Sequence, residues 1–583
     1  MTNVAVQMVL YCVLLIALAV PLGIYIGKVM NGEKVFLSRI LVPVENGIYK
    51  LLKVDKKEDM HWKKYAACVG VFSVLSLAVL WLILCFQNFL PLNPEKLDGT
   101  SWHLGFNTAA SFITNTNWQA YSGEYTLSYF TQMIGLNYQN FVSAAVGIVV
   151  LFVLIRGFIK VKEKGIGNFY TDMVRTVLYV LLPLSVIVSV VIVSQGVPQT
   201  FRAYDEVDLV EPVLVENEDG TVTEVTKQVI PLGPAASQIA IKQLGTNGGG
   251  FFGNNSANPL ENPTPLSNLF EMLALLLIPV ALCFTFGRNV KDKRQGKAIF
   301  LAMFIMLGAA LAVIGYNEQK GTPQIEQDGA VYTGTQGQAG GNMEGKETRF
   351  GIATSAAWAG FTTAASNGSV NSMHDSYTPI GGLVPMLLMM LGEVVFGGTG
   401  CGLYGMLGFA IMAVFIAGLM VGRTPEYLCK KIEPFEMKMA ILVCLATPVA
   451  ILAGSGLAAL LPATADSLNN PGAHGLSEVL YAYSSAGGNN GSAFAGFNAN
   501  TTFLNVSIGL VMLFVRFVPM FATLAVAGHL AEKKKVAVSA GTLPTHNAMF
   551  IFLLIMIVLL VGALSFFPAL SLGPIAEYFQ MIK

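Results

Sequence analysis

The sequence predicts an all-α polytopic membrane protein with ten transmembrane helices, arranged mainly as four parallel repeats of span, pore loop and span around one pore. Two observations lead to this fold class. Hydrophobic residues make up 54% of the 583 residues, charged residues only 12%, and the mean hydropathy is +0.60. This composition is typical of integral membrane proteins and leaves no room for a large soluble domain. In addition, four segments rich in asparagine and glycine recur between the apolar runs.

The overall charge and the cysteines exclude several other classes of protein. The formal net charge is zero, so we expect no nucleic-acid partner. The seven cysteines include no CxxC pair and mostly lie in apolar runs, so neither a disulfide framework nor a zinc framework is expected. The first apolar run begins with MTNVAVQM, which lacks basic residues, and Lys28 follows the run. A cleaved signal peptide has its basic residues first, so we interpret this run as a retained span.

Apolar runs long enough to cross a bilayer give the order of the elements. The predicted spans are 4–28, 65–90, 126–156, 174–195, 265–286, 298–316, 377–422, 437–461, 501–529 and 546–568. Cytoplasmic loops retain lysine and arginine, and this bias fixes the orientation of the spans. Alternate loops hold 26 of the 35 basic residues, in segments 28–64, 156–175, 288–297, 423–438 and 533–535. Both termini are therefore predicted to face outward.

The run 377–422 is too long for one simple helix. Its 46 residues, at about 1.5 Å each, would be roughly twice the hydrocarbon thickness. Two crossings would place the basic segment 423–438 outside and invert every later loop. We therefore predict one crossing that is broken at GGTGCG, residues 397–402, which Gly392 and Glu393 precede. Broken helices in membranes are usually functional, and a plain packing kink is the alternative.

The stretch TNGGGFFGNN, residues 246–255, carries the strongest functional signal. Its three successive glycines allow backbone carbonyls to turn toward one axis, and such carbonyls replace the water around a dehydrated cation in potassium filters. A short helical stretch at 235–244 precedes it and the span 265–286 follows, which is the order of a re-entrant pore loop. A phosphate-binding loop is the competing interpretation, but no GK[ST] follows the glycines.

Three further segments share this small, polar character. They are TNTNWQAYSGE at 114–124, TTAASNGSVNSMHD at 362–375 and SSAGGNNGSAF at 484–494. The reference residues Asn117, Gly248, Gly368 and Gly491 follow one another at intervals of 131, 120 and 123 residues. Each segment lies between an outward-going and an inward-going span, so the repeats are parallel and four of them can surround a single pore. Ordinary exterior loops, which are rich in the same residues, are the alternative.

A short helix is predicted before each segment, at 106–112, 235–244, 352–361 and 477–483. The C-terminus of a helix carries about half a negative charge, so four of them aimed at one point supply roughly two negative charges, which favours a cation. No ATP site is predicted in this chain. The DKTG sequence of P-type pumps is absent, and GNMEGKE at 341–347 has glutamate where a Walker motif requires Ser or Thr.

The motifs TNTNWQ, LGTNGGGFF, TTAASNGSVNSMHD and NNGSAFAG resemble the four filter segments of the potassium-binding A subunit of the Kdp-type potassium-transporting ATPase. The resemblance covers nearly the whole chain and implies a member of the superfamily of potassium transporters, with one extra helix at each end. The third motif departs slightly, with SNG at 366–368, and the exterior loops 196–234 and 317–350 vary freely. The expected divisions are 1–60 for the N-terminal span and loop, 61–165, 166–290, 291–432 and 433–535 for the repeats, and 536–583 for the last span.

The resemblance also implies the activity. The chain would select extracellular potassium, the transported ligand, and pass it through an intramembrane tunnel to a P-type ATPase subunit in the bacterial cell membrane. A single-span accessory subunit, a small membrane peptide and the lipid bilayer would be its other partners. The chain itself would have no catalytic site and no cofactor. A stand-alone potassium channel or cation symporter of the same superfamily is the alternative, and a nontransporting membrane scaffold is a more distant one.

The resemblance assigns individual residues to a filter and a gate. The filter would comprise Asn115, Thr116, Asn117 and Gln119, then Thr246, Asn247 and Gly248, then Asn367 and Gly368, and finally Asn490 and Gly491. The gate would lie at Gly397, Gly398, Gly400 and Gly402, and Arg516 matches an arginine below the filter.

Some of these residues also stand out without the resemblance. An arginine in an apolar span costs about 2.5 to 3.5 kcal/mol on insertion scales, which marks Arg516 as functional, although snorkelling toward the inner face is the alternative. The same argument gives Glu393 either an ion-path role or a structural role. His374 and Asp375 end the third segment, just past its predicted filter residues, and we expect them to brace that loop.

Overall fold

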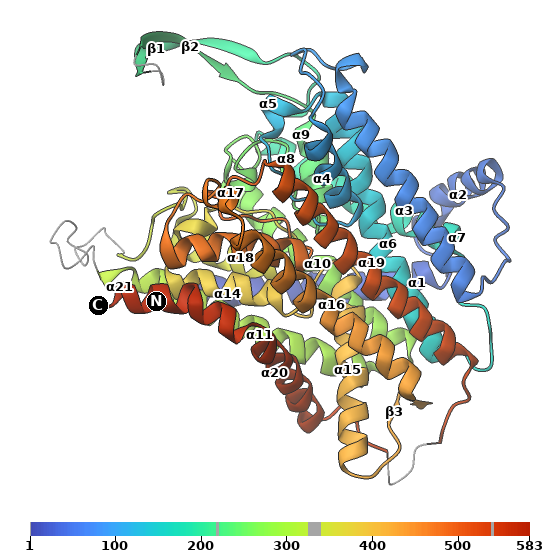
Figure 1. Cartoon of the computed structure of the whole chain (residues 1–583). Helices are drawn as coiled ribbons and strands as arrows, with labels where there is room; N and C mark the ends of the chain where they lie inside the picture. Colours follow the sequence, from blue (N-terminus) through green and yellow to red (C-terminus); the bar gives the residue numbers. More distant parts are fainter. Residues whose placement is uncertain (1, 217–220, 324–339, 538–541) are drawn as a thin grey trace.

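The computed structural model describes residues 2–216, 221–323, 340–537 and 542–583, and it shows a largely helical chain (Figure 1). Ten of the described helical segments are long and apolar enough to cross a membrane, which confirms the predicted number of spans. These segments are α1 (Thr2–Met30), α3 (Trp62–Cys85), η2 with α6 (Thr131–Asn137 and Tyr138–Ile159), α7 with η3 and α8 (Phe169–Arg175, Thr176–Leu181 and Leu182–Ser194), α10 (Pro265–Asn289), α11 (Lys293–Lys320), α15 (Cys401–Met420), α16 (Pro434–Ala459), α19 (Thr502–Glu532) and α20 (Ala548–Leu572).

Shorter helices occupy the connections between the spans. Four of them precede the predicted filter segments: α4 (Trp102–Ile113), α9 (Ala235–Leu244), α13 (Gly351–Ala364) and α18 (Gly472–Gly487). The others are α2 (Ser38–Leu52), α5 (Gly123–Thr126), α14 (Pro379–Met390), α17 (Pro462–Ala465), α21 (Pro574–Met581) and the 3-10 turns η1 (Gln87–Phe89), η4 (Asn255–Ala257) and η5 (His374–Ser376). All four predicted short helices are present, and three of them extend beyond the predicted bounds.

The predicted break in the run 377–422 is also present. Helix α14 ends at Met390 and α15 begins at Cys401, so ten residues between them are not helical. Gly392, Gly397 and Gly400 in this segment have positive φ angles of 82°, 61° and 87°, which no right-handed helix contains. Of the two helices, only the 20-residue α15 is long enough to cross a bilayer alone.

Polar residues at the helix starts explain where several spans begin. Thr264 caps α10 by accepting a hydrogen bond from the N–H of Ser267, and Pro265 occupies the first helical position. Thr501 and Asn547 cap α19 and α20 in the same way. Each cap satisfies an N–H group that the helix itself leaves unpaired, so these termini are well defined.

The burial of the spans separates a centre from a periphery. In the most apolar part of the span Thr131–Ile159, 89% of the residues are buried inside the protein, compared with 22% for Trp62–Cys85. Helices α6, α10 and α15 therefore belong to the core, whereas α1, α3 and α20 expose apolar side chains on the outside. Apolar side chains on the outer face of a bundle are expected where lipid replaces water.

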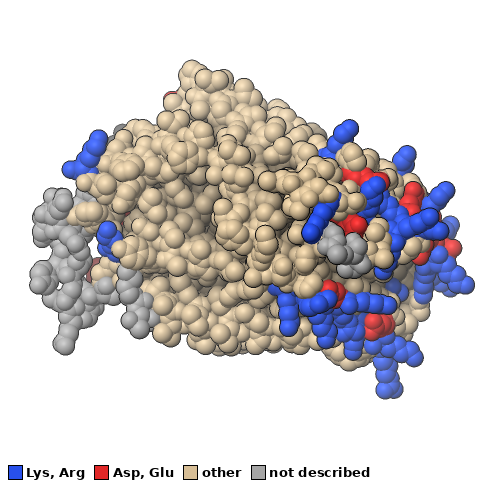
Figure 2. All heavy atoms as spheres, turned by 90° about the horizontal axis from the view of Figure 1, so that it is seen from below, with Lys and Arg blue, Asp and Glu red and all other residues tan. Residues whose placement is uncertain are grey.

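Charged residues are distributed unevenly over the surface. Lys and Arg side chains gather mainly at one end of the molecule (Figure 2), where α2 and the short hairpin of β3 (Glu426–Tyr427) and β4 (Lys430–Lys431) lie. Both termini lie at the other end (Figure 1). A second antiparallel hairpin, β1 (Asp205–Glu216) with β2 (Val222–Ile230), projects from the body. This distribution agrees with the orientation predicted from the basic loops, which itself stays a prediction.

Candidate functional site

Helices α4, α9, α13 and α18 hold four loops of the same backbone geometry. Each helix ends four residues before its reference residue, Asn117, Gly248, Gly368 or Gly491. In each loop the reference residue and the residue two positions earlier have positive φ: Asn115 and Asn117 (74° and 55°), Thr246 and Gly248 (52° and 81°), Ser366 and Gly368 (50° and 95°), and Asn489 and Gly491 (52° and 102°). Because positive φ is uncommon outside glycine, its recurrence at the same two positions indicates one shared conformation.

The N–H groups of these loops turn back onto their own helices. The residue before each reference residue donates its N–H to the carbonyl oxygen five positions earlier, at 2.8–3.0 Å: Thr116 to Ser111, Asn247 to Lys242, Asn367 to Thr362 and Asn490 to Ser485. In each loop, the N–H of the reference residue donates to an oxygen of the residue that also accepts this first hydrogen bond, at 2.8–3.2 Å. The N–H groups at these two positions of each loop are thus hydrogen-bonded to the preceding helix.

The carbonyl oxygens that follow these donors behave differently; they belong to Thr116, Asn247, Asn367 and Asn490. Within the part of the chain that the structure describes, none of these four oxygens accepts a hydrogen bond. All four residues are buried, with 0% of each exposed. A buried carbonyl without a donor is costly unless another group satisfies it, so four such oxygens in equivalent places form a potential cation site.

Three of the contacts between neighbouring loops require glycine. A Cβ atom at Gly248 would lie 1.9 Å from the carbonyl oxygen of Asn367, and one at Gly368 would lie 2.1 Å from that of Asn490. A Cβ atom at Gly491 would likewise lie 2.1 Å from the carbonyl oxygen of Thr116. The first and second loops complete the ring, because Asn115 Nδ2 donates to the carbonyl oxygen of Thr246 at 2.8 Å.

Side-chain amides tie the loops together further. Asn367 Nδ2 donates to the carbonyl oxygen of Lys242 at 2.9 Å, and Asn490 Nδ2 donates to that of Thr362 at 2.9 Å. Gln119 pairs with both backbone groups of Gly250, at 2.8 and 3.0 Å. The structure therefore brings all the predicted filter residues to one place, and their role as potassium ligands stays a prediction.

A cavity of about 750 Å³ adjoins the ring. Residues of all four loops line it, among them Trp118, Phe252, Gly368 and Gly491. The cavity leaves open space directly against the four loops.

The predicted gate lies directly against the ring. Thr399 donates its N–H to Thr246 Oγ1 at 2.9 Å, and Gly397 donates its N–H to the carbonyl oxygen of Ala364, at the end of α13, at 2.8 Å. A Cβ atom at Gly400 would lie 2.2 Å from the carbonyl oxygen of Gly147 in α6, and one at Gly402 would lie 1.8 Å from that of Phe396. The broken segment is thus packed against the second loop, the end of α13 and the core helix α6.

Arg516 reaches this segment from the middle of α19. Its side chain contacts Cys401 Sγ, and Nη1 lies 3.2 Å from Asn489 Oδ1 when the Asn489 amide is oriented to donate to Thr116 and Thr114. Only 2% of Arg516 is exposed, so the side chain does not extend to the surface as snorkelling would require. Glu393 Oε2 accepts a hydrogen bond from the N–H of Gly398 at 3.3 Å, which gives this carboxylate a structural contact in the same segment.

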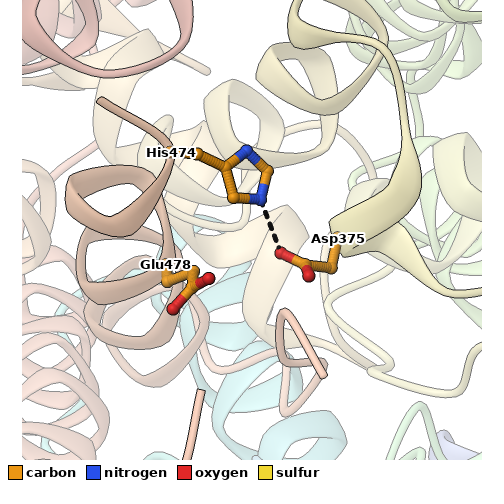
Figure 3. Close-up of side chains that lie close together, drawn as sticks. All are labelled: Asp375, His474 and Glu478. Carbon is orange, nitrogen blue, oxygen red and sulfur yellow. Dashed lines mark hydrogen bonds and ion pairs between the residues drawn. The ribbon is translucent and has the colours of Figure 1, made fainter. Parts of the chain in front are cut away.

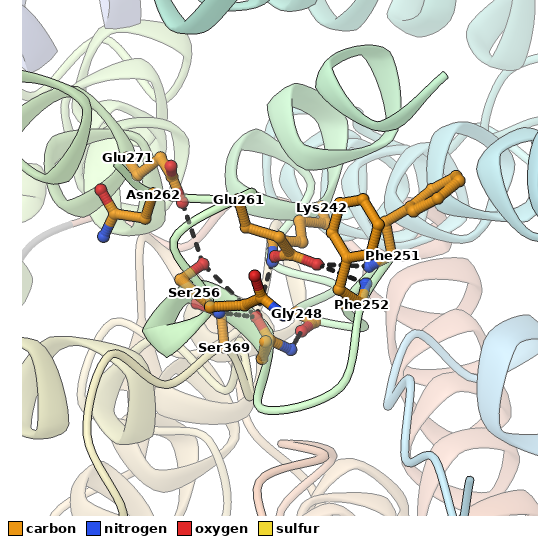
Figure 4. A network of polar contacts seen from close by, with 12 residues as sticks. Lys242, Gly248, Phe251, Phe252, Ser256, Glu261, Asn262, Glu271 and Ser369 are labelled. Atoms are coloured by element: carbon orange, nitrogen blue, oxygen red, sulfur yellow. Dashed lines mark hydrogen bonds and ion pairs between the residues drawn. The ribbon is translucent and has the colours of Figure 1, made fainter. Parts of the chain in front are cut away.

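Two buried ion pairs beside the second and third loops were not anticipated from the sequence. Lys242 Nζ pairs with Glu261 (Figure 4), and Lys346 Nζ pairs with Glu318 Oε2 at 2.7 Å. All four side chains have 0% exposure. The one available signal was Lys242 itself, because a lysine within the short apolar helix AASQIAIKQL must find a partner when buried.

The expected bracing role of His374 and Asp375 agrees with their contacts. His374 Nδ1 lies 2.7 Å from the Tyr481 hydroxyl, and burial lowers the pKa of His374 to about 3. Asp375 Oδ1 lies 2.8 Å from His474 Nε2, with Glu478 close by (Figure 3). These contacts link the third loop to α18, the helix of the fourth loop.

His474 also contacts the C-terminal helix α21. Its Nδ1 atom lies 2.8 Å from Glu577 Oε1. The hydrogen bonds with Asp375 and Glu577 raise the pKa of His474 to about 10. At neutral pH the imidazole is therefore a cation held between two carboxylates.

The chain is also similar to known proteins over nearly its whole length. A family model described as "Potassium-transporting ATPase A subunit" matches residues 9–579. Curated relatives named "Potassium-transporting ATPase potassium-binding subunit" include those of Clostridium botulinum (strain Alaska E43 / Type E3), 73% identical over 582 residues, and Clostridium perfringens, 67% identical over 582 residues. Both alignments cover 100% of this chain and 100% of the relative.

A solved structure of the potassium transporter TrkH from Vibrio parahaemolyticus is also similar. It matches with a TM-score of 0.49 and 12% sequence identity, covering 89% of this chain and 96% of that chain.

Proposed function

Because this chain belongs to the family of potassium-transporting ATPase A subunits, we propose that its four loops form the potassium filter of the pump. The carbonyl oxygens of Thr116, Asn247, Asn367 and Asn490 carry this proposal, since they are buried and accept no hydrogen bond from the described residues. Carbonyl oxygens can replace the hydration shell of potassium. The C-termini of α4, α9, α13 and α18 add about half a negative charge each near the loops, which favours a cation without a fixed carboxylate.

The four-repeat organisation is part of this proposal. Repeats at 61–165, 166–290, 291–432 and 433–535 each contain one short helix and one loop of the shared conformation. The equal spacing between helix end and reference residue supports four copies of one unit around a single axis. The segments 1–60 and 536–583 then contribute the extra spans α1 and α20.

Beyond the ring, the ion meets the gate and then Arg516. The broken segment between α14 and α15 contacts the second loop through Thr399 and Thr246, and Arg516 lies beside the same segment. A fixed buried cation at this depth opposes straight passage to the far side of the membrane. We propose that potassium instead leaves sideways toward a P-type ATPase subunit, which supplies the energy from ATP.

The remaining features of the proposal are those that the sequence resemblance and the basic loops lead us to expect. The complex would lie in the bacterial cell membrane with both termini of this chain outward, and it would include a single-span subunit and a small membrane peptide. Potassium would be the transported ligand, and no catalytic site or ATP site would lie in this chain.

Purification from the native membrane tests the proposal. The chain, isolated by an affinity tag, should bring an ATPase subunit with it, and ATP hydrolysis by the isolated complex should increase on addition of potassium. A chain that purifies without an ATPase and conducts potassium passively in vesicles would instead be a stand-alone channel. The proposed hand-over to a pump subunit would then be wrong.

A further inference from the structure

We propose that Asn255, Lys242 and Glu261 are positioning residues that hold the carbonyl group of Gly248 in place and thereby sharpen the ion discrimination of the ring. This inference rests on the proposed filter function. It concerns three residues that are not among the predicted filter residues: Asn255 ends the stretch 246–255, and Lys242 and Glu261 lie outside it. Figure 4 shows Lys242 and Glu261 beside Gly248.

Asn255 is the part of this brace that contacts the filter. Its Nδ2 donates a hydrogen bond to the carbonyl oxygen of Gly248. Its Oδ1 accepts hydrogen bonds from Lys242 Nζ at 2.6 Å and from the N–H of Ser256 at 2.8 Å. The two oxygen contacts fix the orientation of the amide, so the nitrogen must face Gly248.

Lys242 and Glu261 hold Asn255 and the rest of the loop. Glu261 Oε2 pairs with Lys242 Nζ, while Glu261 Oε1 accepts the N–H groups of Phe251 and Phe252. The backbone carbonyl of Lys242 accepts the N–H groups of Asn247 and Gly248 at 2.8 and 3.0 Å. One lysine therefore anchors the loop through its backbone and its side chain.

The second loop differs from the other three in this respect. Among the described residues, no donor reaches the carbonyl oxygens of Asn117, Gly368 or Gly491, the positions equivalent to Gly248. A carbonyl oxygen has two lone pairs, so the Gly248 oxygen can accept from Asn255 and still face an ion. Because the Asn255 bond limits its movement, this carbonyl cannot follow a smaller or larger ion as freely as an untethered one can.

A single substitution of Lys242 or Glu261 is a poor test of the proposal, because removing one partner leaves an unpaired buried charge, which is strongly destabilising. Asn255 offers a cleaner change. It has a φ of 54° and is only partly buried, so Asn255→Gly removes the side chain while keeping a residue that tolerates this backbone. Its neighbour Asn254 has a φ of 60° and is exposed, so Asn254→Gly is a matched control.

The test measures potassium-stimulated ATP hydrolysis by the purified complex. For Asn255→Gly we expect the KM for potassium to rise by about tenfold, as loss of one partly buried hydrogen bond predicts, with kcat changed by less than about twofold. Discrimination against rubidium and sodium should fall in parallel. Asn254→Gly should leave KM, kcat and discrimination at wild-type values. If Asn255→Gly instead caused a general loss of structure, it would lower kcat and the yield of complex.

A double variant and a filter variant complete the test. Lys242→Met with Glu261→Gln removes both charges of the pair, while the amide oxygen at position 261 can still accept the N–H groups of Phe251 and Phe252. This double variant should also raise the KM for potassium. If Gly248→Asp alters discrimination but Asn255→Gly and the double variant do not, the brace is wrong and the filter proposal stands. If Gly248→Asp also leaves discrimination unchanged, the proposed filter itself is wrong.

Discussion

Individual glycines in the ring have no room for a side chain. A Cβ atom at Gly368 would lie 2.1 Å from the carbonyl oxygen of Asn490, and its φ of 95° adds strain of about 1–2 kcal/mol for any other residue. We therefore predict that Gly368→Ala displaces the Asn490 carbonyl and raises the KM for potassium at least about tenfold. Gly308→Ala is the control, because that helical glycine has open space around its Cβ position. Equal potassium affinity in both variants would remove Gly368 from the filter.

The charge of His474 should make stability depend on pH. Its hydrogen bonds with Asp375 and Glu577 raise the pKa from 6.5 to about 10 in the folded protein. A group whose pKa is raised by folding stabilises fully below its unfolded pKa, and it loses this contribution as pH rises through the folded value. The stabilisation should therefore be complete below pH 6.5 and decrease up to about pH 10.

Thermal unfolding of the purified protein between pH 6 and pH 10 checks this dependence. The difference in Tm between the wild type and His474→Gln should be largest at the acidic end and shrink toward the alkaline end. A difference that stays constant over this range would mean that the His474 cation does not link α18 to its partners.

Residue-level features were predictable where they depend on local sequence. The run TNGGGFF requires unusual backbone angles, and both Thr246 and Gly248 do have positive φ. The Lys242 and Glu261 pair was not predictable, because it depends on the path that the chain takes between them. The same holds for Glu318 and Lys346, which are 28 residues apart in sequence and come from a helix and a loop.

At the scale of elements, the broken segment between α14 and α15 is the feature most sensitive to substitution. Gly400 has a φ of 87°, and a Cβ atom there would lie 2.2 Å from the carbonyl oxygen of Gly147. We predict that Gly400→Ala forces the segment away from α6 and lowers ATP-driven potassium uptake at least about tenfold, because strain and clash together exceed about 1.4 kcal/mol.

Gly405→Ala provides the comparison for this variant. It lies in α15, where an added Cβ would make only ordinary contacts, 3.5 Å from Val394 Cγ1. Uptake measured in vesicles with the reconstituted complex should be near wild type for Gly405→Ala. If Gly400→Ala behaves like Gly405→Ala, the close packing of the break against α6 has no role in transport.

The elements themselves were predicted to different extents. The break in the run 377–422 was predicted from the basic residues of the loops, since a second crossing there would have moved the later basic loops to the opposite side of the membrane. The short helix α4 begins before its predicted start because Ser101 caps it, accepting a hydrogen bond from the N–H of Leu104. Helices α13 and α18 also extend beyond their predicted bounds, but no side chain caps their first turns. The hairpin of β1 and β2 was not predicted, because its strands are mostly exposed and carry no buried alternating pattern.

At the scale of the whole molecule, the concentration of Lys and Arg at one end predicts the orientation in the membrane. Exposed Asn498 follows the fourth loop, and exposed Lys293 is the first residue of α11, among several basic residues. In a background without the seven native cysteines, Asn498→Cys should react with a membrane-impermeant thiol reagent added outside intact cells, whereas Lys293→Cys should react only after the cells are opened. The reverse pattern would invert the predicted topology.

The position of Arg516 connects the ring to the direction of transport. Its guanidinium is buried beside the gate, in contact with Cys401 and near Asn489, which precedes the fourth filter carbonyl. Repulsion between this charge and a potassium ion amounts to about 4 kcal/mol at a separation of 4 Å and an effective dielectric constant of 20. In the mechanism that we propose, a barrier of this size would disfavour straight passage through the membrane by about three orders of magnitude, and would so favour a sideways exit.

Removing the charge should therefore loosen the coupling between transport and ATP hydrolysis. We predict that Arg516→Gln increases the potassium flux that occurs without ATP relative to ATP-driven uptake, when both are measured in vesicles containing the whole complex. Arg423→Gln, which removes an exposed arginine from a basic loop, should change neither flux. A purely structural role for Arg516 would lower the amount of folded complex but leave the ratio of the two fluxes unchanged, so this ratio decides whether the buried arginine acts as the barrier.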